Sequence, residues 1–361
     1  MNNTAYLLAL HSIDGLGPIR LKAVLDYFKD PKLAWEASRE ELLKIGIYQK
    51  TIDLLFDTRK KLDPQKYLEY IQSSGIKWIT VFDENYPKLL SQIYDPPIVL
   101  YYKGILNCLE KKCIAVVGTR KMTGYGKAVC EQFVKALVNF NLTIVSGLAR
   151  GIDAASHKTT VLEGGQTVAV LGGGLNEIYP PENKGLAQDI INGHGAILSE
   201  FPPDYPSMPG NFPARNRIIS GLSLATLVVE AAQDSGSLIT ARLALEQGRD
   251  VFAIPGPITS SLSKGPINLI KDGAIVVTEP GEILDELGIF NRSDRSNPTD
   301  MSNLSEDEKK VLEVLQNESL HIDEIGRKLN FESAKISAML LKMEISGLVQ
   351  NLGSGTYCAS T

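Results

Sequence analysis

Between about residue 76 and residue 290 the chain alternates short apolar runs with amphipathic stretches. The runs are four or five residues long: Cys113–Val117, Leu142–Val145, Thr167–Leu171, Ala196–Ser199, Ala225–Val229, Asp250–Ile254 and Ala274–Val277. Runs that are largely apolar, without strict alternation, are typical of parallel strands buried on both faces. The pattern therefore predicts an α/β fold with a doubly wound parallel sheet.

The N-terminal segment has helical spacing punctuated by glycine. Apolar residues follow Gly15-Leu16-Gly17-Pro18 at helical intervals, and a similar unit begins at Leu42. This predicts a small helical domain of the SAM/helix-hairpin-helix-like kind. The glycine turn has two interpretations that the sequence leaves open: a hairpin whose backbone N–H groups hold a phosphate, or a tight turn between packed helices.

The C-terminal pattern predicts a winged helix. Ser305 and Glu308 have the spacing of a capping box, helices are expected at His321–Leu329 and Ser333–Glu344, and a hairpin is expected around Gly353. A polar stretch rich in Ser and Asn precedes them and has the composition of a linker. The expected divisions are a helical domain 1–65, an α/β domain 66–290, a linker 291–303 and a winged helix 304–361.

Composition and charge narrow the class of protein and the kinds of site that it can contain. The 361 residues are 43% hydrophobic and 22% charged, as in soluble globular proteins. No apolar run could cross a membrane and the start lacks the features of a signal peptide, which predicts a cytoplasmic protein. The four cysteines form no CxxC pair, so free thiols and no metal site are expected. With a net charge of −5, any nucleic-acid site must come from a few well-placed groups.

Glycines, basic residues and small polar residues follow the predicted strands at their carboxyl ends. Ligands bind at these ends in this fold. Glycines there let backbone N–H groups approach an anion, and each following helix adds its positive end. Arg120, Arg150 and Lys184 are expected to clamp phosphates with their side chains. The remaining candidates at these ends are Gly118, Thr119, Thr123, Gly126, Ser146, Gly147, Gly151, Gly173, Gly174, Asn183, Ser235, Gly236 and Ser237.

A proline-rich stretch presents Phe212 shortly before Arg215-Asn216-Arg217. An aromatic ring beside guanidinium groups can stack an unpaired base while the arginines hold its phosphates. The same residues could equally be structural, with Phe212 buried and the arginines in internal ion pairs. The composition alone leaves both interpretations open.

Several enzyme classes are disfavoured. The first strand ends in Gly-Thr-Arg-Lys-Met-Thr-Gly, so the GxGxxG dinucleotide fingerprint is absent, and the GxxxxGK[ST] loop of ATPases is absent too. The four histidines are isolated from any nucleophile motif and are interpreted as ordinary structural residues. We therefore expect no catalytic residue and no cofactor.

The order of the motifs carries a family resemblance. GxRxxTxYG, SGLARGIDAASH, AVLGGGLNEIYPPEN, SEFPP, FPARNRIISGLS, VVEAAQDSGSLITA, GRDVFAIPG and GPINLIKDGA follow one another here. This series closely resembles the DprA/Smf family across the whole α/β domain. The resemblance implies an extended Rossmann-like domain that binds single-stranded DNA at the strand ends, with Arg120 central, Lys184 in the pocket and Phe212 as base-stacker. It also implies a homodimer joined through that domain, which recruits the RecA recombinase during natural transformation.

Two other functions stand as alternatives. Nucleoside-monophosphate phosphoribohydrolases of the lysine-decarboxylase-like group share this sheet type but carry PGGxGT followed by a catalytic glutamate. The nearest loops here are Ser235–Arg242 and Pro255-Gly256-Pro257; neither puts a carboxylate in the first helical turn, and Glu246 comes too late. A transcription factor acting through the winged helix is a weaker alternative, because residues 305–361 carry nine acidic and only six basic side chains.

Overall fold

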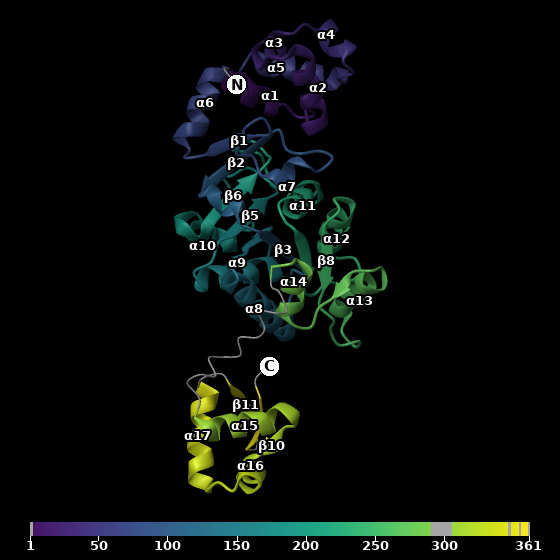
Figure 1. The fold of residues 1–361 in the computed structure, drawn as a ribbon. Coiled ribbons are helices and arrows are strands. Elements are labelled where there is room, and N and C mark those ends of the chain that lie inside the picture. Colours follow the sequence, from purple (N-terminus) through teal and green to yellow (C-terminus); the bar gives the residue numbers. More distant parts are fainter. Residues whose placement is uncertain (1–2, 290–304, 346–347, 354, 360–361) are drawn as a thin grey trace. The chain divides into compact units, whose positions relative to one another are not determined.

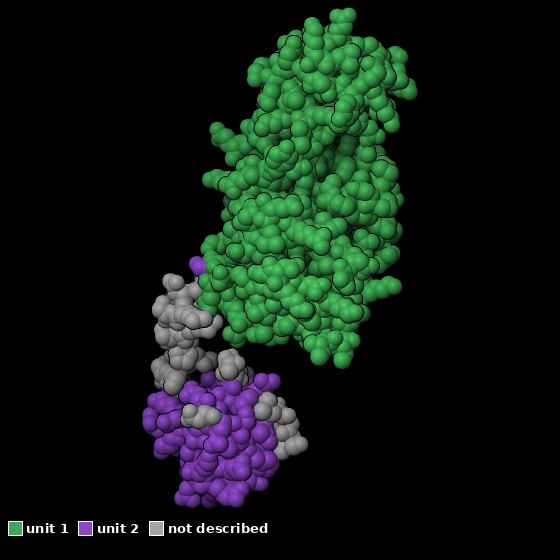
Figure 2. Space-filling model, turned by 90° about the vertical axis from the view of Figure 1, so that its right-hand side faces the viewer, with its two compact units in different colours: residues 1–287 green, residues 288–361 purple. Residues whose placement is uncertain are grey.

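The computed structural model describes residues 3–289, 305–345, 348–353 and 355–359. It divides into two compact units, residues 1–287 and residues 288–361, coloured green and purple in Figure 2. The predicted linker 291–303 lies outside the described residues.

The first unit is built on a nine-stranded sheet (Figure 1). Its strand order is β1-β2-β6-β5-β4-β3-β7-β8-β9, and all neighbours from β6 to β9 are parallel. The strands are β1 (Lys77–Thr80), β2 (Val99–Gly104), β3 (Cys113–Val117), β4 (Thr143–Ser146), β5 (Thr167–Leu171), β6 (Gly195–Ser199), β7 (Ala225–Val228), β8 (Asp250–Ala253) and β9 (Ile275–Val276). The seven predicted strands and their parallel arrangement are confirmed.

Two further strands are not predicted by the sequence pattern. β1 pairs antiparallel with β2, and β2 pairs antiparallel with β6, with Tyr101 opposite Ser199. β1 has polar residues at both ends, Lys77 and Thr80, and β2 has a polar end at Lys103 and Gly104, so neither strand has the continuous apolar pattern of the parallel core. The sheet is therefore mixed at this edge.

Both faces of the sheet are covered, as a doubly wound fold requires. Along β5, Val168 and Val170 belong to one buried cluster, whereas Ala169 and Leu171 belong to the other. The helices that follow the central strands are α8 (Gly124–Asn139), α9 (Ile152–Leu162), α10 (Lys184–Asp189), α11 (Asn211–Gly221), α12 (Ser237–Glu246), α13 (Lys264–Lys271) and α14 (Pro280–Glu286). Short helical turns are η1 (Leu106–Glu110), η2 (Pro181–Asn183), η3 (Ile190–His194) and η4 (Ser261–Ser263).

The N-terminal helices have clear local start signals. Asp30 accepts hydrogen bonds from the backbone of Lys32 and Leu33, and Ser38 forms a capping box with Glu41. These helices are α1 (Thr4–His11), α2 (Pro18–Phe28), α3 (Pro31–Glu36), α4 (Arg39–Lys44), α5 (Gln49–Arg59) and α6 (Pro64–Ser73), with α7 (Lys88–Ser91) between β1 and β2. The helical character predicted for this segment is confirmed.

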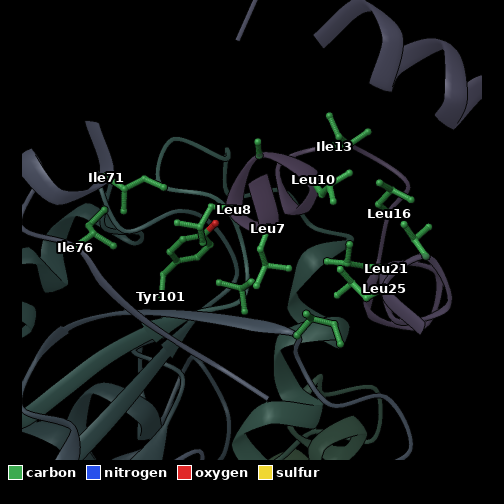
Figure 3. Packing of buried hydrophobic residues seen from close by; sticks show 14 of the residues in the cluster. Leu7, Leu8, Leu10, Ile13, Leu16, Leu21, Leu25, Ile71, Ile76 and Tyr101 are labelled. Carbon is green, nitrogen blue, oxygen red and sulfur yellow. The ribbon is translucent and has the colours of Figure 1, made fainter. Parts of the chain in front are cut away.

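The N-terminal helices share a core with the sheet. Leu7 and Leu8 of α1 belong to the same buried cluster as Ile71 of α6 and Tyr101 of β2 (Figure 3). The cluster continues to Leu171 on β5. Because apolar packing runs across the predicted boundary at residue 65, the helices and the sheet form a single compact unit.

The second unit has the winged-helix order. Its elements are α15 (Glu306–Asn317), β10 (Leu320–His321), α16 (Ile322–Leu329), α17 (Ser333–Ile345), β11 (Val349–Gly353) and β12 (Thr356–Ala359). Ser305 and Glu308 form the predicted capping box. The recognition-helix position is α17, and both of its lysines pair with α15: Lys335 with Asp307 at 2.6 Å and Lys342 with Glu308 at 2.8 Å.

The free thiols predicted for the cysteines are confirmed, and His157 of α9 is a buried helix residue. All four cysteines are free thiols, three of them buried. His157 is fully buried, contacts the Thr167 hydroxyl at 2.7 Å, and has its pKa lowered to about 3 by desolvation. Within the described residues no group of three or more His, Cys, Asp or Glu side chains could hold a metal ion. None of the described helices is both long enough and apolar enough to span a bilayer.

Candidate nucleic-acid interface

A pocket lies at the carboxyl ends of the central strands, and we call it the arginine pocket. Three arginines and two aromatic rings line it. The lining residues are Arg120, Gly147, Ala149, Arg150, Tyr179, Pro180, Phe212 and Arg215. They come from the loops after β3, β4 and β5 and from the first turns of α11, so the topology of the sheet gathers them.

Arg120 is an exposed cation of this pocket that has no carboxylate partner among the described residues. It follows β3 in a short loop, and its guanidinium carbon lies 5.1 Å from the centre of the Phe212 ring. Among the residues that the structure describes, no carboxylate forms a salt bridge with it. A guanidinium held on an aromatic ring keeps its N–H groups available at the ring edge for a phosphate.

Arg215 lies deeper in the pocket than Arg120 and is only 4% exposed. Its Nη1 donates to the carbonyl oxygen of Val170 at 2.6 Å, but its Nε finds no acceptor in the described part of the chain. Burial lowers the pKa of Arg215 to about 10, with the nearby Asp153 carboxylate opposing that shift and Arg120 adding to it. The floor of the pocket thus carries a buried, incompletely bonded cation, which favours an anion above it.

Arg150 lies on the rim and is already paired. It forms an exposed salt bridge with Glu182, which raises the pKa of Arg150 and lowers that of Glu182. The amide of Asn183 donates to the carbonyl oxygen of Leu148 at 2.8 Å and so braces the neighbouring loop. Lys184 is exposed at the start of α10 but does not line the pocket.

Two helix N-termini that were predicted to bind phosphates, those of α8 and α9, are occupied by carboxylates of the chain itself. Glu230 accepts from the backbone N–H and the hydroxyl of Thr123, at 3.0 and 2.6 Å, and abuts Gly126 at the start of α8. Asp153 accepts from the N–H groups of Gly147 and Ala149 near the start of α9. An internal anion satisfies these donors, so they do not point freely at a ligand.

Other predicted glycines and hydroxyls serve close packing. A loop formed by residues 202–207 covers Gly173 and Gly174, and the Gly174 N–H donates to the carbonyl oxygen of Tyr205. Gly118 and Gly151 pack against neighbouring backbone so closely that a Cβ would clash. Thr119 and Ser146 are buried and engaged in internal hydrogen bonds.

Arg217 points away from the pocket, in accordance with its structural interpretation. It is 7% exposed and bonds both carboxylate oxygens of Glu200, at 2.8 and 2.6 Å, and Asp95 at 2.9 Å. Asn216 donates to the Gly236 carbonyl, and Ser235 and Ser237 bond each other. These residues lie outside the pocket lining.

The structure therefore gathers part of the predicted set. Arg120, Gly147, Arg150, Phe212 and Arg215 line one pocket. Tyr179 lines it too, although the sequence pattern gives this residue of the motif IYPPEN no role. Its position two residues before η2, beside a glycine-rich strand end, is the signal that could have suggested it.

The fold and the pocket define a class: a Rossmann-like α/β protein with an arginine-lined pocket at the strand ends and a winged helix attached. Comparison with known proteins identifies the family. Residues 77–288 match the family of DNA recombination-mediator protein A, and residues 295–355 match the DprA winged helix domain. The chain belongs to this DprA/Smf family.

Relatives cover nearly the whole chain. Protein Smf of Synechocystis is 37% identical over 96% of both chains, and Protein Smf of Escherichia coli is 38% identical over 93% of this chain and 94% of its own. The X-ray structure of DNA processing protein A from Streptococcus pneumoniae has a TM-score of 0.69 at 38% identity, covering 78% of this chain and 97% of that one. The fold prediction, including its Rossmann-like sheet, is confirmed.

A second solved relative concerns DNA directly. A structure of DNA processing protein A from Helicobacter pylori, described as giving insights into its unique single-stranded DNA binding mode, has a TM-score of 0.54 at 30% identity. It covers 59% of this chain and 97% of that one. Membership in a family of recombination mediators agrees with the expectation that this chain is not an enzyme.

Proposed function

We propose that this chain binds single-stranded DNA in the arginine pocket and passes the strand to the RecA recombinase during recombination, including natural transformation. The observation that carries the proposal is Arg120, an exposed guanidinium seated on Phe212 close to the buried cation of Arg215. The single-stranded DNA binding of the Helicobacter pylori relative supports it. Lys184, exposed at the start of α10 and outside the pocket lining, is proposed as a further phosphate contact.

The proposal includes the organisation of the protein. It acts in the cytoplasm as a homodimer joined through the α/β domain 66–290, with the helices of residues 1–65 packed on that domain and the winged helix at 304–361. The family matches at residues 77–288 and 295–355 support the α/β and winged-helix parts of this arrangement. The phosphoribohydrolase alternative is not favoured by the carboxylates near the pocket: Asp153 and Glu230 accept from backbone or hydroxyl donors, and Glu182 pairs with Arg150.

Comparative binding tests the proposal. Fluorescence anisotropy with a labelled oligonucleotide about 30 nucleotides long is expected to show clear preference for the single strand over the matching duplex, and affinity that falls steeply with salt. Equal affinity for both forms, or salt-independent binding, would contradict a site built on phosphate contacts and unpaired bases.

The winged helix is proposed to dock a protein partner and not the DNA. Both lysines of α17 are paired with carboxylates of α15, so this helix offers little free cationic surface to a phosphate backbone. Removing residues 299–361 is therefore expected to change single-strand affinity by less than about twofold, since the phosphate contacts that set affinity remain.

Anisotropy on the shortened chain checks this, with thermal melting to confirm that the first unit stays folded. Loss of most of the binding would show that the winged helix holds DNA. Tight duplex binding by an isolated 299–361 fragment at physiological salt would show the same.

A further inference from the structure

The loop of residues 202–207, which we call the covering loop, contacts the segment that follows β5. The N–H of Gly174 donates to the carbonyl oxygen of Tyr205 at 2.7 Å. The N–H of Asn176 donates to the carbonyl oxygen of Pro203 at 3.0 Å, and a Cβ on Gly174 would clash with that oxygen. The covering loop is therefore held closely against one of the strand ends that build the arginine pocket.

The same loop holds the start of α11, which carries two pocket residues. The Asn211 side chain donates to the carbonyl oxygen of Pro206 at 3.2 Å and to that of Gly172 at 2.9 Å. Asn211 is buried and is the first residue of α11, and Phe212 and Arg215 of the pocket follow it in the helix. The position of the covering loop therefore affects how the first turn of α11 is presented to the pocket.

A hydrogen-bonded triad joins the covering loop to α6 of the N-terminal helices. The Tyr70 hydroxyl donates to Oδ2 of Asp204 at 2.6 Å. The Asn176 amide donates to Oδ1 of Asp204 at 2.8 Å and to the Tyr70 hydroxyl oxygen at 2.9 Å. Each of the three side chains thus bonds the other two, although Tyr70 lies 134 residues from Asp204 in the sequence. A closed network of this kind fixes the loop in one geometry.

The glycine turn of the N-terminal helices faces carboxylates. Residues 13–18 line a cavity of about 300 Å³ together with Tyr205 of the covering loop, Asp95 and Glu200. Arg217 lines it too but already bonds both of those carboxylates. A phosphate in this cavity would meet groups of its own charge, which favours the interpretation of the turn as a tight turn between packed helices.

We infer that Tyr70 and Asp204 are positioning residues through which the N-terminal helices hold the arginine pocket in its binding geometry, an inference that rests on the proposed function. Neither residue lines the pocket. A covering loop that is fixed before the strand arrives need not be ordered during binding, so more of the contact energy appears as affinity. Coupling between two sites is reciprocal, so a bound strand must in turn stabilise the contact between the loop and α6.

Tyr70→Phe isolates the contribution of the N-terminal helices, because it removes one hydroxyl and no charge. Asp204 keeps its bond to Asn176, so single-strand affinity of the full chain should fall about threefold, the effect of one modest hydrogen bond. Asp204→Ala removes both side-chain bonds of the loop and should lower the affinity about tenfold. Loss of a negative charge by itself favours DNA binding, so such a decrease would not come from charge.

Anisotropy with a single-stranded oligonucleotide over a series of salt concentrations measures these effects. Neither substitution removes a phosphate contact, so the slope of log affinity against log salt should keep its wild-type value. Thermal melting should show that both variants fold, since Tyr70 and Asp204 are exposed. Tyr27→Phe is the matched control and should change nothing, because Tyr27 is an exposed tyrosine of α2 whose hydroxyl bonds no described residue.

Hydrogen exchange followed by mass spectrometry gives a readout at the covering loop itself. The backbone N–H groups between residues 204 and 212 should exchange faster in both variants than in the wild type or in Tyr27→Phe. Saturating single-stranded oligonucleotide should slow this exchange, as reciprocal coupling requires.

The double variant Tyr70→Phe/Asp204→Ala should bind nearly like Asp204→Ala, because Tyr70 acts on the loop through Asp204. Fully additive losses, or wild-type affinity in both folded single variants, would overturn the inference while leaving the proposed function intact. A wild-type chain that fails to bind single strands would overturn the proposed function itself.

Discussion

Arg120→Ala is expected to weaken single-stranded DNA binding about 30- to 160-fold, because a hydrogen-bonded charge interaction contributes roughly 2–3 kcal/mol. The slope of log affinity against log salt should fall by about 0.7 for each phosphate that the variant no longer neutralises. Melting temperature should stay unchanged, since Arg120 is exposed and packs on the Phe212 ring at the protein surface. Anisotropy at several salt concentrations measures the affinity and the slope, and thermal melting followed by circular dichroism measures the stability.

Two further variants make this result specific. Arg120→Lys keeps the charge but loses the planar fork that binds a phosphate bidentately, so it should recover only part of the affinity. Lys121→Ala removes one charge from the neighbouring exposed position outside the pocket lining, and should have a small effect. If Lys121→Ala and Arg120→Ala weakened binding equally, the strand would be held by general electrostatic attraction to the positive surface and not by contacts in a defined pocket.

The parallel core of the fold could be predicted because its strands are buried on both faces. Cys113–Val117 and Thr167–Leu171 are apolar along most of their length, which is the pattern such strands require. β1 and β2 escaped prediction because they lie at the antiparallel edge and carry polar residues. That the N-terminal helices share a core with the sheet was equally hidden, since Leu8 and Tyr101 are far apart in the sequence.

The candidate site was predictable in place but not in detail. Fold topology puts the strand ends together, so the region around Arg120 and Arg150 could be located from sequence. Which glycine or arginine faces a ligand depends on internal partners, and those partners are distant in sequence. Glu230 lies 107 residues from Thr123, and its carboxylate satisfies the donors of that helix end.

The two arginines of the Arg-Asn-Arg segment also differ in their internal partners. They are two residues apart, so on an α-helix their side chains point in different directions. Arg215 faces the pocket floor, and Arg217 faces Glu200 and Asp95 on another side of α11. Sequence composition gives both the same chemistry, whereas the helix gives them different surroundings.

Arg217→Ala is therefore expected to lower the free energy of unfolding by about 3–5 kcal/mol, the usual cost of removing one partner from a buried ion pair. The substitution leaves Glu200, which is only 9% exposed, close to Asp95 without its cation. Urea unfolding followed by circular dichroism measures the loss. Lys158→Ala, at an exposed position that forms no salt bridge with any described residue, is the matched control and should cost less than about 0.5 kcal/mol.

The loss of stability in Arg217→Ala should also depend on pH. Burial already raises the pKa of Glu200, and removal of Arg217 takes away the main opposing effect, so the pKa rises further in the folded variant. When the pKa of a carboxyl group is higher in the folded than in the unfolded state, the protonated group stabilises the fold at low pH. That stabilisation is lost as the pH rises from the unfolded-state pKa through the folded-state pKa. Arg217→Ala should thus be less destabilised, relative to the wild type, at about pH 5 than at about pH 8.

DNA binding decides between the two interpretations of Arg217. The arginine pocket does not include it, so the folded fraction of Arg217→Ala should bind single-stranded DNA with the wild-type salt slope and nearly wild-type affinity. Glu200→Gln should destabilise the chain in the same way, because Arg217 would then lose the carboxylate that takes two of its hydrogen bonds. A variant that melts like the wild type but has the reduced salt slope of Arg120→Ala would instead make Arg217 a phosphate ligand. The Arg217 guanidinium already bonds two carboxylates, so binding a phosphate would require these ion pairs to open. Wild-type stability of Arg217→Ala would mean that the ion pairs contribute nothing to the stability of the fold.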